Sequence, residues 1–429
     1  MGTFLAVTFI ITAVLGAPIW IVLASSSLVS LNFASSTPLI VVVQRMFTST
    51  DSFPLLAIPL FMISGNLMEG GGISRRLIKF SDALLGWLPG GLGMVAILTC
   101  MFFAAISGSG PATVAAVGGI MIPEMVKAGY GRAFSAALLS VAGAIGVIIP
   151  PSIPMVNFGV AGSVSISTLF AAGFLPGILV GLSLMVVCYF GSKKYGYGMQ
   201  DRRSFSIRTL GKSFVEAFWA LLMPIIILGG IYGGVFTPTE AASVSVIYGF
   251  VIGVFVYKEM KIRDLTQMLM NASKSTAMVM MIIAAASGFG WILTSERIPD
   301  SIATTIMSLT SNKYVILLLI NLLLLFIGCI METTASIIIL TPIFLPMVTR
   351  LGVNPIHFGI IMVVNLAIGM STPPLGVNLF VSCGIAKISI EENSKQIFKF
   401  LSANIIALLL ITYIEPISMI IPRLMGLVR

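Results

Sequence analysis

The residues best suited to chemistry in this chain are helix breakers, hydroxyls and one carboxylate, and they occur in two matched sets. The first set lies at 107–110 (Ser-Gly-Ser-Gly) and 150–152 (Pro-Pro-Ser). The second lies at 332–334 (Glu-Thr-Thr) and 372–374 (Thr-Pro-Pro), and the two Pro-Pro steps begin 223 residues apart, at 150 and 373. A helix interrupted within lipid exposes backbone groups, which is tolerated only where they line a cavity. The pattern therefore predicts a transporter binding site built from two equivalent halves.

Each half offers oxygen atoms to a cation and helix N-termini to an anion. Freed carbonyls suit Na⁺, because a hard cation prefers oxygen ligands. The oxygen atoms expected to bind Na⁺ are the carbonyls of Ala105, Gly146, Ile149, Gly328, Gly369 and Thr372 and the hydroxyls of Ser107 and Thr333. A proline kink without a ligand is the structural alternative. One Pro-Pro step alone would favour that alternative, whereas two at matched positions favour a site.

Glu332 is the outstanding charge, since it falls within an apolar stretch, where a carboxylate is a functional candidate by default. Its side chain is expected either to bind a cation, a proton or the substrate, or to cap the helix that starts at this point. Asn157 and Asn378 follow the two Pro-Pro breaks. Each is interpreted either as a substrate donor or as an amide packed between helices. The sequence leaves both pairs of alternatives open.

The composition places these residues in a membrane. Of the 429 residues, 58% are hydrophobic and 9% are charged, and the mean hydropathy is +1.08. A soluble domain of this size does not have that composition, so we predict an all-α polytopic membrane protein. The net charge of +9 is spread over loops, as the positive-inside rule expects, and no basic face indicates nucleic acid.

Several other functional classes are not expected. The four cysteines lie at unrelated spacings in apolar segments, and the single His357 has no Cys or His neighbour, so neither disulfides nor a catalytic metal is predicted. The chain carries no HExxH motif and no Walker motif, which argues against an intramembrane enzyme and an ATP-driven permease subunit. A channel would need a continuous polar path, whereas the polar groups cluster at two tips. We therefore expect no enzymatic activity.

The apolar segments predict two inverted repeats within a helical frame, with the first two segments at 3–24 and 27–47. Segments 91–107 and 110–127 form a re-entrant hairpin from the cytoplasm, and 314–331 and 334–349 form a second from the outside. Each hairpin precedes a broken helix, at 133–160 and 355–384. The expected divisions are scaffold helices 1–72 and 214–295, arm helices 73–90 and 296–313, repeat segments 91–191 and 314–429, and a cytoplasmic connecting loop 192–213.

At these residues the sequence resembles the large membrane subunit of the tripartite ATP-independent periplasmic (TRAP) transporters, in the ion transporter superfamily. The matching strings cover nearly the whole chain. They include 52–60 (SFPLLAIPL), 149–154 (IPPSIP), 236–242 (FTPTEAA) and 372–380 (TPPLGVNLF). By this similarity, Ser107 and Ser152 are expected to face the substrate.

The resemblance implies Na⁺-coupled uptake of a carboxylate across the bacterial inner membrane by an elevator motion. Sialic acid, C4-dicarboxylates and related sugar acids are the expected substrate classes. It also implies a small four-helix membrane subunit, expected here as a separate chain, and a periplasmic substrate-binding protein. The alternative is a stand-alone Na⁺- or H⁺-coupled anion carrier of the same superfamily. In either case, the hairpins and broken helices would slide as a unit against the frame.

Overall fold

The fold is entirely helical in the part of the chain that the computed structural model describes, which is residues 1–197, 204–310 and 312–428. Eight helices of these residues are long and apolar enough to cross a membrane. No strand occurs in the described residues, as expected where every backbone group must be satisfied within its own segment. The predicted all-α polytopic class is confirmed.

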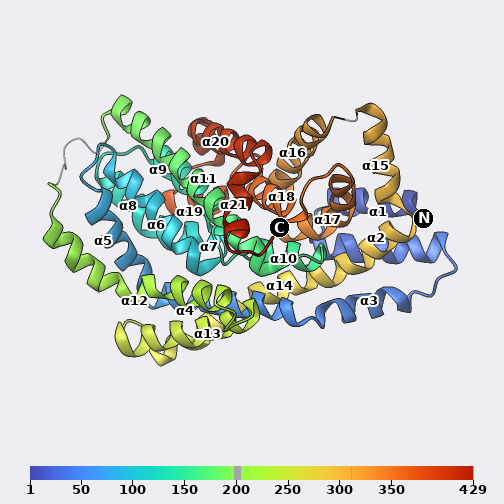
Figure 1. The fold of residues 1–429 in the computed structure, drawn as a ribbon, viewed down its shortest axis with the longest axis horizontal. Helices are drawn as coiled ribbons and strands as arrows, with labels where there is room; N and C mark the ends of the chain where they lie inside the picture. The colour runs from blue at the N-terminus through green and yellow to red at the C-terminus, as the bar shows by residue number, and fades with distance from the viewer. Residues whose placement is uncertain (198–203, 311, 429) are drawn as a thin grey trace.

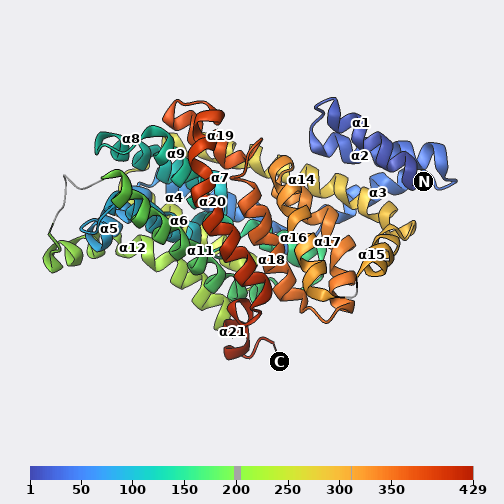
Figure 2. The same cartoon turned by 90° about the horizontal axis from the view of Figure 1, so that it is seen from above.

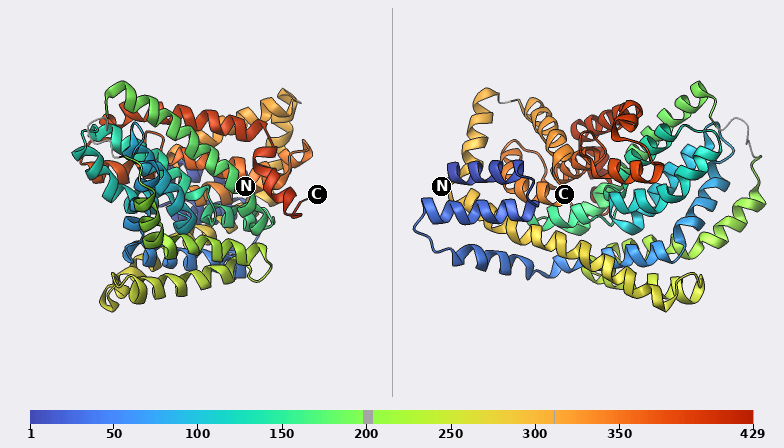
Figure 3. Two further views of the ribbon diagram at one scale, coloured as in Figure 1. Left: turned by 60° about the vertical axis from the view of Figure 1, so that its left-hand side comes forward. Right: turned by 180° about the vertical axis from the view of Figure 1, so that it is seen from behind.

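One layer of helices runs along the lower edge of the molecule in Figure 1 and is seen from behind in Figure 3. Its helices come from both predicted scaffold segments, and α14 packs against α2, α3 and α4, while α13 packs against α4 and α12. The bounds are α3 Ile40–Thr50, α4 Ala57–Gly70, α12 Ile207–Tyr232, α13 Pro238–Val251 and α14 Ile262–Ser295. We call this layer the frame. Its role as a fixed scaffold stays a prediction.

The N-terminal region corrects the sequence prediction. Two spans were expected at 3–24 and 27–47, but the structure has three short helices, α1 (Gly2–Val14), α2 (Ile19–Ala34) and α3. Gly16, with a φ of 75°, and Pro18 end the first, and Pro38 lies in the second break. Hydropathy continues across these turns because the turn residues are small and uncharged, so the breaks are hidden from a hydropathy profile.

The first repeat segment follows the predicted order of a hairpin, a broken helix and a long helix. The hairpin is α6 (Gly91–Ser107) followed by α7 (Gly110–Thr113), a π-helical turn at Val114–Gly118 and α8 (Gly119–Lys127). The broken helix is α9 (Arg132–Gly143), a 3₁₀ turn at Ala144–Val147 and α10 (Ile153–Ala161), and α11 is Ile166–Tyr195. Pro150 and Pro151 lie in the break and are joined by a cis peptide bond.

The second repeat segment has the same order of elements. Its hairpin is α16 (Lys313–Ile330) and α17 (Thr333–Arg350), and its broken helix is α18 (Pro355–Gly369) and α19 (Val377–Ala386). The helix ends keep the offset of 223 residues, since α6 ends at Ser107 and α16 at Ile330, and α9 begins at Arg132 and α18 at Pro355. The break contains a cis bond between Pro373 and Pro374. The inverted orientation of the two segments stays a prediction.

Two predicted boundaries are wrong. The connecting loop is shorter than 192–213, because α11 continues to Tyr195 and α12 already begins at Ile207, where Ser206 caps it by accepting a hydrogen bond from the Thr209 N–H. Residues 198–203 of that loop lie outside the described residues. The last helix is two helices, α20 (Ile390–Tyr413) and α21 (Pro416–Leu424). Hydropathy detects the apolar part of a helix and misses its polar turns.

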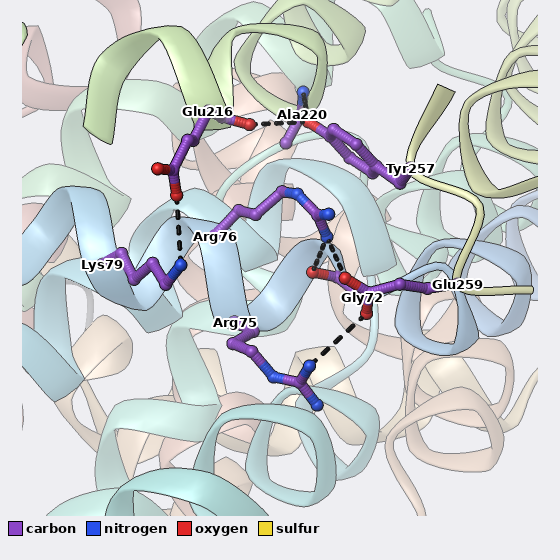
Figure 4. A network of polar contacts seen from close by, with 8 residues as sticks. All are labelled: Gly72, Arg75, Arg76, Lys79, Glu216, Ala220, Tyr257 and Glu259. Carbon is purple, nitrogen blue, oxygen red and sulfur yellow. Dashed lines mark hydrogen bonds and ion pairs between the residues drawn. The ribbon is translucent and has the colours of Figure 1, made fainter. Parts of the chain in front are cut away.

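Both predicted arm helices are present, α5 at Ile73–Leu85 and α15 at Ile298–Leu309. Figure 4 shows α5 joined to the frame: Arg76 Nη1 lies 2.7 Å from Glu259 Oε1, and Lys79 Nζ lies 3.1 Å from Glu216 Oε2. The Arg76 guanidinium also stacks 3.7 Å from the centroid of the Tyr257 ring. The second arm instead pairs with the second hairpin, through contacts described below.

Candidate functional site

All four interruptions of the two repeat segments border one cavity of about 160 Å³. The hairpin tips contribute residues 108–111 and 328–334, and the helix breaks contribute residues 153–154 and 375–377. Two frame residues, Met62 of α4 and Val279 of α14, close another wall. Residues separated by more than 200 positions in the sequence thus border the same cavity.

Helix N-termini surround this cavity. The helices α7, α10, α17 and α19 begin at Gly110, Ile153, Thr333 and Val377, and each of these residues lines it. The helix dipole gives each of these N-termini partial positive charge. At α10 the first-turn N–H groups are already used, because Ile153 donates to the Gly108 carbonyl and Met155 to the Ser152 hydroxyl. Four such ends around one cavity favour an anion. Outside these backbone groups the lining is mostly apolar, with Met331, Met370 and Leu375 among its side chains.

Of the two roles that the sequence left open for Glu332, the structure shows the helix cap, and the binding role stays a prediction. Glu332 Oε2 accepts a hydrogen bond of 3.1 Å from the Ala335 N–H and so caps α17. The same residue lines the cavity. A capping carboxylate is stabilised by the helix dipole, and it still presents oxygen lone pairs to a cation that enters the cavity.

Thr333 supplies an oxygen without a partner. It is 3% exposed, and its Oγ1 has no hydrogen-bond partner among the described residues. A buried hydroxyl left unsatisfied costs free energy, so an oxygen-seeking ligand at this atom would be favourable. This arrangement fits the predicted role of Thr333 as a Na⁺ ligand.

The predicted carbonyl ligands fall into two groups. Within the described part of the chain, the carbonyls of Ala105, Gly146, Ile149, Gly328 and Thr372 receive no backbone or side-chain hydrogen bond at the helix ends. The Gly369 carbonyl differs, because it accepts a bond of 2.9 Å from the Thr372 N–H. Only Gly328 of this set lines the cavity itself. Of the others, Ala105 lies near the end of α6, and Gly146, Ile149, Gly369 and Thr372 lie at the two helix breaks.

Gly328 and Gly369 bring the second hairpin and the second broken helix into direct backbone contact. A β-carbon placed on Gly369 would lie 2.6 Å from the Gly328 α-carbon. A β-carbon placed on Gly146, the corresponding position in the first segment, would meet the Thr113 side chain and the Ser109 carbonyl. Small residues allow helices to approach this closely within a membrane. The three glycines predicted as ion ligands, Gly146, Gly328 and Gly369, therefore also have a packing reason.

Ser107 and Ser152 do not line the cavity in this conformation. The Ser107 hydroxyl lies 3.0 Å from that of Thr113. The Ser152 hydroxyl donates to the Val147 carbonyl and accepts from the Met155 N–H, so it caps α10. Each hydroxyl thus stabilises the chain beside a tip or a break. The predicted contacts to substrate would require these bonds to rearrange.

Asn157 and Asn378 lie between helices of different repeat segments. Asn157 Nδ2 donates to Thr334 Oγ1 at 3.1 Å, which joins α10 to the tip of the second hairpin. Asn378 Nδ2 donates to the Ser140 carbonyl at 3.3 Å, which joins α19 to α9. The Oδ1 atoms of both have no partner among the described residues. In this conformation each is an interhelical amide with one acceptor atom still available.

The sequence did not predict the residues that accept these hydrogen bonds. Thr334 was treated only as part of the Glu332 tip, yet it receives the bond from Asn157. A buried network of Asn321, Asn365 and Thr412, which links α16, α18 and α20, was also missed. A paired polar residue in an apolar helix carries no periodic signal, because its partner comes from another helix.

Comparison with known proteins agrees with this architecture. A family model described as the tripartite ATP-independent periplasmic transporter, DctM component, matches residues 6–417. The isethionate TRAP transporter permease protein DctMQ of Oleidesulfovibrio alaskensis is 50% identical over 411 residues, which are 96% of this chain and 65% of that protein. This chain therefore spans just under two thirds of that relative.

Two further similarities are informative. The C4-dicarboxylate TRAP transporter large permease protein DctM of Pseudomonas aeruginosa is 44% identical over 383 residues, which are 89% of each chain. The crystal structure of the Alcanivorax borkumensis YdaH transporter matches with a TM-score of 0.65 and 17% identity, covering 88% of this chain and 89% of that one. The second similarity establishes a likeness of fold.

Proposed function

Since this chain belongs to the DctM family of large permease subunits of the tripartite ATP-independent periplasmic transporters, we propose that it carries out Na⁺-coupled uptake of a small organic anion. We place it in the bacterial inner membrane, together with a small four-helix membrane subunit and a periplasmic substrate-binding protein. The fused relative DctMQ supports the small subunit. The binding protein follows from the tripartite description of the family.

The observation that carries this proposal is the single cavity bordered by four helix N-termini and by Glu332. The N-termini favour an anion, whereas the carboxylate repels it. A bound Na⁺ would remove that repulsion. The two ligands would then bind more tightly together than separately, which is the coupling that a symporter needs.

The ion would be held at the two tips and at the breaks behind them. Around the second tip, the Thr333 hydroxyl and the Gly328 carbonyl provide oxygen atoms without hydrogen-bond donors in the described chain. In the first repeat segment, the Ala105 carbonyl is the equivalent of the Gly328 carbonyl, and the Gly146 carbonyl lies at the helix break. An ion bound there would fix the tip in place and shape the anion site between the two hairpins.

The arrangement of layers supports an elevator motion. Met62 and Val279 of the frame line the cavity, and the other lining residues belong to the repeat segments. The cavity therefore lies at the boundary between the two layers. If the hairpins and broken helices slide together against the frame, the anion moves with them and the frame closes the opposite side.

The substrate is proposed as a carboxylate or a sulfonate. The Pseudomonas aeruginosa relative is named for C4-dicarboxylate and the Oleidesulfovibrio alaskensis relative for isethionate. Backbone N–H groups at helix ends bind either anion, because both present several oxygen acceptors. The expected class thus widens from carboxylates such as sialic acid to small organic acids in general.

Uptake into proteoliposomes tests the proposal. Vesicles contain this chain and the small subunit, the binding protein is added outside, and labelled C4-dicarboxylate or isethionate is supplied with and without an inward Na⁺ gradient. We expect uptake only when both Na⁺ and the binding protein are present. Vesicles that contain the small subunit alone are the control.

The other outcomes separate the alternatives. Uptake that needs Na⁺ but no binding protein would indicate a stand-alone carrier of the same superfamily. Uptake driven by a pH gradient and indifferent to Na⁺ would assign the coupling role to Glu332 as a proton carrier. No uptake of any tested organic anion, with a correctly assembled complex, would contradict the proposal.

A further inference from the structure

A large apolar cavity lies behind the second hairpin, at the end of the molecule marked N in Figure 1. It measures about 510 Å³, is partly open to the surface, and is bordered by α1, α14, α15, α16 and α17. Every described lining residue is apolar, including Phe9, Phe289 and Leu340. This volume falls within the range of ligand pockets. A pocket lined only by apolar side chains favours an apolar occupant, because burying apolar surface against it is favourable.

A second, polar cavity of about 250 Å³ adjoins the first. Ile343 of α17 lines both cavities. The polar cavity is bordered by two guanidinium groups, Arg297 and Arg350, and by one carboxylate, Asp300. Asp300 Oδ1 lies 3.0 Å from Arg350 Nη2, and these side chains are 56% and 58% exposed. Two cations against one anion leave the cavity with a positive balance.

The polar cavity lies at the ends of two helices. It lies between the last turn of α17, which ends at Arg350, and the first turn of α15, which begins at Ile298. The apolar cavity extends from there along α17 toward its beginning, past Leu340 and Ile339. Guanidinium groups at the end of a membrane helix can bind the phosphate of a lipid headgroup through charge-assisted hydrogen bonds, while the adjoining apolar pocket takes the acyl chains.

We propose that these two cavities together form a binding site for one phospholipid. The phosphate would lie between Arg297 and Arg350, and the acyl chains would fill the apolar cavity between the second arm and the second hairpin. Substrate is a poor candidate for this site, because a small organic anion has no apolar part to fill the larger cavity. Free phosphate would leave that cavity empty.

The site has a direct connection to the candidate functional site. Met331, the residue before Glu332, lines both the apolar cavity and the cavity at the hairpin tips. A lipid chain behind Met331 would support the second tip from the side opposite the substrate. Figure 2 shows α15 and α17 close together at the same end of the molecule, so the lipid would also join the arm to the hairpin.

The test counts lipid on the assembled complex of this chain and its small subunit. The complex is reconstituted into vesicles of phosphatidylethanolamine and radiolabelled phosphatidylglycerol, extracted into detergent, washed, and analysed for labelled lipid per chain. The Arg350→Gln variant should retain about tenfold less labelled lipid, because a lost charge-assisted contact costs at least about the 1.4 kcal/mol that a tenfold change represents. Leu340→Trp, which fills the apolar cavity, should also lose it.

Two matched variants serve as controls. Asp300→Asn breaks the same ion pair as Arg350→Gln but leaves both guanidinium groups, so we expect it to retain the lipid. Leu340→Ala enlarges the apolar cavity and should retain the lipid as well. Gel filtration verifies assembly, and Ile302→Trp replaces Leu340→Trp if the latter fails to assemble, since Ile302 lines the same cavity from α15.

Three results would overturn the proposal. Equal retention by all variants would place the labelled lipid elsewhere on the complex. Equal loss in Asp300→Asn and Arg350→Gln would show that the ion pair shapes the arm and that the arginine does not bind phosphate. Complete displacement of the labelled lipid by inorganic phosphate would mean that the acyl chains contribute no binding. The readout does not depend on transport, so this proposal and the proposed function fail separately.

Discussion

The side-chain amide of Asn157 donates a 3.1 Å hydrogen bond to the hydroxyl of Thr334, and this bond ties the first broken helix to the tip of the second hairpin. Both side chains are buried, with 1% and 2% exposure. The contact crosses 177 residues of sequence and lies directly behind the cavity. It is one of the bonds through which the two repeat segments would move as a single unit.

A double-mutant cycle measures this bond. Asn157→Ala and Thr334→Ala should each lower the free energy of unfolding by about 1 kcal/mol, since each removes one buried hydrogen bond. Their coupling energy should be about 0.6 kcal/mol, the average for bonds between membrane helices. Thermal and denaturant unfolding of the purified chain gives both values. Additive effects would mean that the bond contributes nothing in the native membrane protein.

The carboxylate of Glu332 gives a second prediction. Glu332→Gln keeps an oxygen that can accept from the Ala335 N–H but removes the charge. If the charge attracts Na⁺, the Na⁺ concentration needed for half-maximal uptake should rise about tenfold, which corresponds to about 1.4 kcal/mol. Glu332→Asp, which keeps the charge, is the matched control. An unchanged Na⁺ dependence in Glu332→Gln would leave the residue with the capping role alone.

Thr372 tests the ion site at the second break. Its hydroxyl donates to the Ile368 carbonyl at 2.8 Å, and its own carbonyl is a predicted Na⁺ ligand. Thr372→Ala should raise the Na⁺ requirement more than it lowers discrimination between substrates, because the backbone at the break loses a local support. Thr372→Ser keeps the hydroxyl and should behave like the wild type. Uptake assays across a range of Na⁺ concentrations distinguish these effects, and an identical Na⁺ dependence in both variants would argue against this placement.

The close approach of Gly369 to Gly328 predicts a packing defect. Gly369→Ala places a methyl group 2.6 Å from the Gly328 α-carbon, so α16 and α18 must separate. We expect a loss of about 1–3 kcal/mol in the free energy of unfolding, as for other overpacked positions. Gly384→Ala in α19 meets nothing within 4 Å and should be neutral or slightly stabilising. Equal stability of the two variants would contradict the close contact.

The network of the first arm predicts a local change in dynamics. Arg76 is 19% exposed and pairs with Glu259, whereas Lys79 is 58% exposed and pairs with Glu216. Glu259→Gln should therefore speed amide hydrogen exchange across α5 several-fold, because a partly buried cation loses its partner. Glu216→Gln should have little effect, since exposed pairs contribute about 0–1 kcal/mol. Equal exchange rates in both variants would show that the Arg76–Glu259 pair does not anchor α5.

The helical class, the two repeat segments and the four interruptions could be predicted from the sequence. Lipid makes an unsatisfied backbone group costly, so each Gly, Ser and Pro cluster in an apolar stretch indicates a feature that must be buried in protein. The hairpin at 91–127 was predicted within one residue of the observed helix ends. Glu332 was found in the same way, because a charge in an apolar segment is conspicuous.

The N-terminal helices and the side-chain partners could not be predicted. The turns at Gly16 and Pro38 contain no charged residue, so hydropathy runs across them. Ser152, which was expected to face substrate, caps its own helix. Asn157, which the sequence left open between a substrate donor and an interhelical amide, bonds to Thr334. A side chain at a helix break can turn toward the cavity, toward its own helix or toward another helix. The same residue type suits all three orientations, so the sequence does not distinguish them.

The sequence by itself therefore determined where the backbone is interrupted, because the cost of breaking a helix in lipid is local and depends on residue type alone. Only the tertiary structure decided that four helix ends meet at one cavity and that Met331 separates this cavity from an apolar one. Those relationships depend on distances between helices that lie more than 200 positions apart. Packing sets these distances, and no periodicity along the chain encodes them.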